Sequence, residues 1–162
     1  MIEQVLKEMK RLLETKLPQE LEKQEGAAGD GIVLGPVNTI LIGDQTYQAT
    51  GLPAIILQPI SAEDALWATG KKDVSYRVAI GVATTDTDED RSQVKLWRTI
   101  RAVENVFEIY APGSVPIINY QTIGIDYKVS LFEIDEDKST EKGGVLSALV
   151  VERLDSYTST QI

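Results

Sequence analysis

The chain has 162 residues, a formal net charge of −9, no cysteine and no histidine. This length fits one domain, which can fold without disulfides or structural metals. The missing cysteines exclude disulfides and thiolate ligands, and the missing histidines exclude the side chain that most zinc sites and serine triads use. We therefore expect a protein that is not an enzyme and that binds no metal and no cofactor, although carboxylate or lysine chemistry stays open.

The acidic charge also bears on partners. An acidic surface repels phosphate and anionic lipid at long range, so specific nucleic-acid or membrane-surface binding is not expected. No apolar run approaches the roughly 20 residues that span a bilayer, so we expect no membrane partner.

The N-terminal third predicts a helix followed by strands. Residues 2–17 place apolar side chains at helical spacing, and Pro18 either ends this helix or opens a further turn. Residues 19–30 are polar and then glycine-rich, which predicts a loop. The apolar, β-branched stretch 32–42 could pair with residues 46–50 as a hairpin.

The middle of the chain predicts a strand over 52–60, a polar loop over 61–73 and a clear strand over 74–83. In that last strand large apolar residues alternate with small ones and Arg77, so its second face should lie under a helix or against another subunit. A helix is expected over 88–110. Its apolar stripe consists of Val94, Trp97, Ile100, Val103, Phe107 and Tyr110.

The C-terminal part predicts two alternating strands, 123–134 and 145–154, joined as an antiparallel hairpin with a charged tip. We expect a single domain over residues 1–155 and a flexible tail over 156–162. The fold class is α+β: a mixed, mostly antiparallel sheet with two amphipathic helices packed on one face. The expected core comprises Leu6, Leu13, Ile56, Val78, Ile80, Val82, Trp97, Ile100, Phe107, Ile125, Tyr127, Val129 and Val150.

Two acidic runs are candidate binding or catalytic sites. Asp86, Asp88, Glu89 and Asp90 could attract a hard cation, but an EF-hand needs glycine and glutamate where this chain has Arg91 and Trp97. Capping of the following helix explains the run better. The run from Glu133 to Asp137 could supply one carboxylate of a glycosidase pair, or it could be a solvated loop. The glycine-rich segment 26–31 lacks the Gly-Lys-Ser/Thr ending of a phosphate loop.

Trp67 stands outside any periodic pattern, so it is either an interface anchor or a loop aromatic folded onto its own core. For contacts between subunits we favour the exposed face of the 74–83 strand, with Ser75 and Arg77, and the loop that holds Trp67, Lys71 and Lys72.

Three segments carry a likeness to a known family: residues 2–6 at the start, 52–57 as the first core strand, and 76–83 running into the helix 92–110. Their order resembles the tail terminator and tail completion proteins, or head-tail joining proteins, of long-tailed bacteriophages. The resemblance implies a homo-oligomeric ring, commonly a hexamer, that caps the tail tube and stops its polymerisation. It further implies contacts with the tail tube protein and the head-side connector or stopper, passage of DNA through the lumen without specific binding, and location in the tail or neck of a virion assembled in the host cytoplasm.

The chain departs from that pattern in the long 26–47 insertion and the large 135–142 loop, which leave the stoichiometry and the partners open. Other structural interpretations are a stopper or a tube subunit. From other classes, a non-viral small-ligand binding domain and a carboxylate-dependent hydrolase also stay open.

Overall fold

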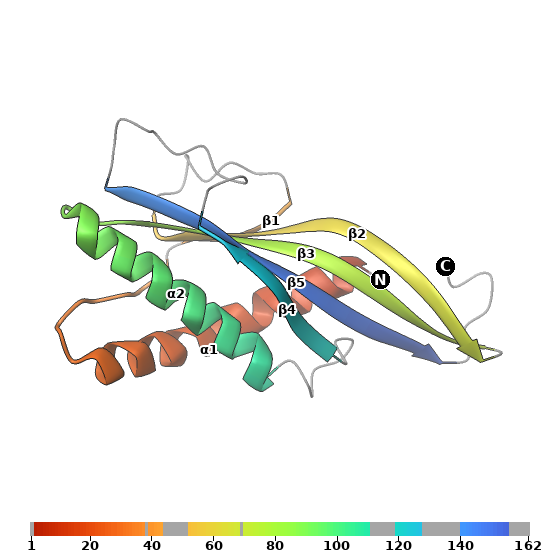
Figure 1. The fold of residues 1–162 in the computed structure, drawn as a ribbon. Coiled ribbons are helices and arrows are strands. Elements are labelled where there is room, and N and C mark those ends of the chain that lie inside the picture. Colours follow the sequence, from red (N-terminus) through yellow and green to blue (C-terminus); the bar gives the residue numbers. More distant parts are fainter. Residues whose placement is uncertain are drawn as a thin grey trace.

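The computed structural model describes residues 2–37, 39–43, 52–68, 70–110, 119–127 and 140–155. Two helices lie on one face of a five-stranded sheet with the order β1-β2-β3-β5-β4 (Figure 1). The elements are α1 (Ile2–Ala28), β1 (Thr39–Ile42), β2 (Ala54–Ala68), β3 (Lys71–Thr85), α2 (Glu89–Tyr110), β4 (Asn119–Asp126) and β5 (Glu141–Asp155). Only β1 and β2 are parallel, so the predicted α+β fold with a mixed, mostly antiparallel sheet is confirmed.

Helix α1 is longer than predicted. It continues through Pro18 to Ala28, because its apolar stripe also continues and buries Leu17 and Leu21 on either side of the proline. A proline inside a helix removes one backbone hydrogen bond, and this burial offsets that cost. Gly29 ends the helix with φ +62° and donates its N–H to the carbonyl of Glu25 at 3.0 Å.

The strands differ from the predictions in several places. β1 starts only at Thr39 and pairs in parallel with Ala54–Leu57 of β2. The hairpin predicted between 32–42 and 46–50 stays a prediction, because residues 46–50 lie outside the described residues. The loop predicted over 61–73 is wrong, because β2 runs to Ala68 in register with β3. β4 starts at Asn119 and pairs antiparallel with β5, which confirms the predicted C-terminal pairing at an earlier position.

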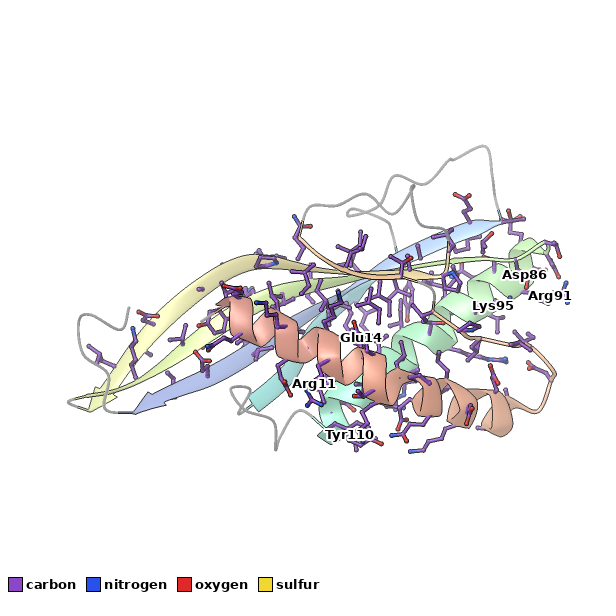
Figure 2. The ribbon with its side chains drawn as sticks, turned by 180° about the vertical axis from the view of Figure 1, so that it is seen from behind. Arg11, Glu14, Asp86, Arg91, Lys95 and Tyr110 are labelled. Atoms are coloured by element: carbon purple, nitrogen blue, oxygen red, sulfur yellow. The ribbon has the colours of Figure 1, made fainter. Side chains whose placement is uncertain are left out.

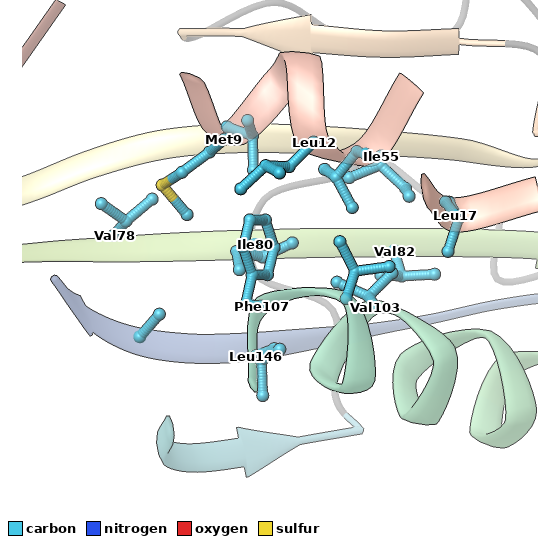
Figure 3. Close-up of a cluster of buried hydrophobic side chains, with 14 of the residues drawn as sticks. Met9, Leu12, Leu17, Ile55, Val78, Ile80, Val82, Val103, Phe107 and Leu146 are labelled. Carbon is cyan, nitrogen blue, oxygen red and sulfur yellow. The ribbon is translucent and has the colours of Figure 1, made fainter. Parts of the chain in front are cut away.

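The main core lies between the helices and the sheet. Met9, Leu17, Ile80, Phe107 and Leu146 meet there, and each is at most 2% exposed (Figure 3). Ile56 is buried as predicted, but in a smaller cluster with Ala54 and Ala83, apart from the main core. The remaining predicted core residues that the structure buries are Leu6, Leu13, Val78, Val82, Ile100 and Val150.

Three predicted core residues are exposed. Trp97 is 49% exposed, Ile125 is 38% exposed and Tyr127 is 49% exposed, whereas Val129 lies outside the described residues. Ile125 shares the helix-side face with Leu146 but belongs to the last strand of the sheet, where the helices give less cover. The prediction for Trp97 failed because the buried stripe of α2 runs through Leu96, Ile100, Val103 and Phe107 instead.

Candidate assembly surfaces

The sheet is longer than the helices that cover it. β2, β3 and β5 project together past the N-terminus of α1 (Figure 1). The name arm is used here for β2 from Pro59 to Leu66 with the β3 and β5 residues paired to it. Every residue of β2 in this arm is exposed, and Ile60 and Leu66 expose 62% and 67% of their surface. A water-exposed strand with large apolar side chains is typical of a contact surface.

The five predicted interface residues lie on this arm or next to it, and the three whose side chains are described do not form one patch. Trp67 is the second-last residue of β2 and Lys71 begins β3, beside the turn at Gly70; the described side chains do not include these two. Lys72 is 4% exposed, and its ammonium lies 3.0 Å from the Asp64 carboxylate. Because side chains alternate between the two faces along a strand, Ser75 and Arg77 point to the face of the sheet opposite to that of Lys72.

The helix-side face of the arm carries a second polar contact. The Tyr76 hydroxyl donates to the Glu152 carboxylate at 3.3 Å, across the β3–β5 pair. Burial, and then the nearby negative charge of Glu152, raises the pKa of Tyr76 to about 12. Tyr76 therefore stays protonated and able to donate over the whole physiological range.

Among the residues that the structure describes, both outer edges of the sheet have open stretches. β1 covers the outer side of β2 only at Ala54–Leu57, and no described residue pairs with that side beyond Leu57. At the opposite edge β4 pairs with β5, and no described residue pairs with its outer side. Unpaired backbone N–H and C=O groups on a sheet edge can hydrogen-bond to another strand.

The two open edges lie at the same level of the sheet. One row of paired residues crosses the sheet from β2 to the start of β4. Glu63 pairs with Ser75, Ser75 pairs with Val151, and Val151 pairs with Asn119. The three antiparallel pairs between them make β2 and β4 run in opposite directions. A copy placed beside the sheet at the same height would therefore bring β4 antiparallel to β2.

Sequence reasoning missed a groove of about 420 Å³ between α1 and the segment that leads into β1. Leu13, Leu17 and Leu21 from α1 meet Val37 and Ile40 across it. Three glutamates line it, and no lysine or arginine does; they are Glu14, Glu22 and Glu25. The groove could not be anticipated, because it depends on the continuation of α1 past Pro18.

The segment beside the groove is held in place by buried and ionic contacts. Glu25 accepts the Leu34 backbone N–H at 2.6 Å, and Arg98 of α2 binds both Asp30 oxygens, at 3.0 and 2.6 Å. The Arg98 hydrogen bonds hold the pKa of Asp30 below its usual range. A Cβ on Gly35 would lie 3.3 Å from Leu21, so the backbone passes close to the helix.

The acidic run before α2 caps that helix, as predicted. The Asp88 carboxylate accepts the Asp90 N–H at 3.1 Å, and the Asp88 carbonyl accepts the Ser92 N–H at 3.0 Å. Asp86 lies 2.7 Å from the Lys95 ammonium, with Arg91 also near (Figure 2). Within the described ranges no three acidic side chains converge as a metal site, and the second acidic run, 133–137, lies outside them.

Asp86 gives a pH-dependent prediction. Its contact with Lys95 and the Asp88 N–H hold its pKa well below the usual range, so the ionised form stabilises the folded state. That contribution is present above the unfolded pKa, near pH 4, and is lost as pH falls through the folded value. Asp86→Asn should lower the melting temperature at pH 7, and the difference from wild type should shrink steadily towards pH 2, measured by calorimetry. Asp90→Asn, with the same change of charge, should give a smaller difference; equal effects would contradict this role.

The chain matches no protein-family model, and no curated protein is significantly similar to it. None of the described helices is long and apolar enough to cross a membrane.

Proposed function

We propose that this chain is a structural virion protein that assembles into a closed ring at the end of a phage tail tube. The ring would end tube polymerisation and join tail to head, with the tube protein on one side and the head-side connector or stopper on the other. DNA would pass through the lumen without specific binding, since an acidic lining repels phosphate. In this role the chain needs no catalysis and no cofactor.

The observation that carries the proposal is a pair of edges, at opposite ends of one sheet, with which no described residue pairs. A closed ring needs heterologous contacts, in which one patch of a subunit meets a different patch of the next. Rotation about an axis along the strands keeps strand direction and height unchanged. Neighbouring copies would then place β4 antiparallel to β2 at one level, and the sheets could join through backbone hydrogen bonds.

The projecting arm supports the same function. An exposed strand edge with Ile60 and Leu66 can pair nonspecifically with other chains and aggregate. A neighbouring subunit in the ring would cover this edge. Arg77 is exposed on the face away from the helices, so it is available to a neighbour or to the tube protein. Lys72 is held by Asp64 and would act by supporting the arm.

Light scattering coupled to size exclusion tests the proposal. We expect a mass that is a fixed multiple of the 17.8 kDa chain, a hexamer in the family resembled, and closed rings in negative-stain micrographs. The same preparation, added to polymerising tail tube protein, should shorten the tubes. Open tubes formed by this chain alone would instead identify a tube subunit, and rings that bind only the head-side connector would identify a stopper.

The groove on α1 favours a second candidate, a small-ligand binding domain. Its volume of about 420 Å³ lies within the range of ligand pockets, and its walls are mostly apolar. This function predicts a monomer at micromolar concentration whose melting temperature rises when an apolar amine is added. A monomer of that kind would count against the ring.

A further inference from the structure

The surface of α2 includes a ridge whose chemistry is the complement of the groove. Trp97 is 49% exposed, and Arg101 follows one turn later with 61% of its side chain exposed. Residues four apart share a helix face, so an indole and a guanidinium lie side by side there. Arg101 donates to Glu104 at 2.9 Å, but a guanidinium has five N–H donors and can bind a second carboxylate.

The groove is apolar and negatively charged. Its floor is apolar, and its described lining residues include Glu14, Glu22 and Glu25 but no lysine or arginine. Val33 on its wall is 62% exposed. An apolar cleft lined by carboxylates fits an aromatic side chain that is accompanied by a positive charge.

The ridge and the groove lie on opposite flanks of the molecule. α1 contacts β1 and β2, whereas α2 contacts β3, β4 and β5, so the groove lies at the β1 end of the sheet. On α2, Trp97 and Arg98 lie on opposite sides of the buried stripe, and Arg98 reaches Asp30 just beyond α1. Trp97 therefore faces away from α1.

We infer that Trp97 of one copy enters the α1 groove of the next copy in the ring, with Arg101 beside Glu22. This inference rests on the proposed ring and names a second contact in it, between the helical layers. The arrangement is heterologous, as ring closure requires, and it has the same direction as the β4-to-β2 contact. Each subunit would use its own ridge once and its own groove once.

Charge exchange between the two surfaces tests this contact. Glu22→Lys and Arg101→Glu should each weaken association about tenfold or more in sedimentation velocity, and Trp97→Ala should do the same. Mixing the two charge variants should restore association, because in a ring where they alternate every interface pairs either Glu22 with Arg101 or the two exchanged charges. The chain that carries both substitutions should also assemble.

Matched controls lie on the same helix as the groove. Glu3→Lys and Lys7→Glu reverse the charges of an exposed ion pair far from the groove lining and should leave association unchanged. If wild type forms rings and all three test variants form them equally well, this contact is wrong and the ring proposal survives. If wild type stays monomeric up to about 100 µM, both proposals fail. Circular dichroism of each variant separates lost association from lost folding.

Discussion

Replacing Phe107 by alanine is expected to lower the free energy of unfolding by about 3–5 kcal/mol. Phe107 is 0% exposed and lies at the centre of the core, between α2 and the sheet strands that carry Ile80 and Leu146 (Figure 3). Truncation removes the transfer free energy of the ring and leaves a cavity that the flanking helix and sheet can fill only in part.

Urea denaturation followed by circular dichroism would measure this loss as a lower midpoint with an unchanged slope. Trp97→Ala on the same helix is the matched control, because it also truncates an aromatic side chain but at a half-exposed position. At concentrations where both variants are monomeric, Trp97→Ala should cost about 1 kcal/mol or less. Equal losses for the two variants would contradict the position of the buried stripe.

Proline at two adjacent positions of the open β2 edge is expected to have two different effects. Backbone N–H groups of successive strand residues point to opposite sides, so Ala62→Pro and Glu63→Pro remove donors from different sides of β2. One variant loses a hydrogen bond to β3 and should melt at a lower temperature. The other loses a donor from the open edge; it should keep its monomer fold and lose at least about tenfold in association.

Each proline variant serves as the control for the other, since both introduce proline at neighbouring positions of the same strand. Size exclusion with light scattering measures assembly, and thermal melting measures the fold. If the better-folded variant forms rings as readily as wild type, β2 does not join the neighbouring sheet. That result would remove the main support for the proposed ring.

Local patterns in the sequence were sufficient for the elements whose apolar periodicity is strong. The alternation from Val74 to Val82 and the helical spacing up to Phe107 each predict their element, because one face of each is buried in the folded protein. The same reasoning correctly assigned the acidic run that contains Asp88 to the capping of α2. It failed for β2 after Pro59, where both faces are exposed and pairing with β3 alone makes the strand.

The sequence by itself determined the fold class, much of the main core and the absence of histidine and cysteine chemistry, because composition and short-range periodicity depend only on the order of residues. Tertiary structure decided the rest. Contacts between residues far apart in the chain decide four features: the continuation of α1 past Pro18, the place of the groove, the sheet edges with which no described residue pairs, and the side of α2 that exposes Trp97. Those contacts determine which residues are buried, and a local sequence pattern does not show them.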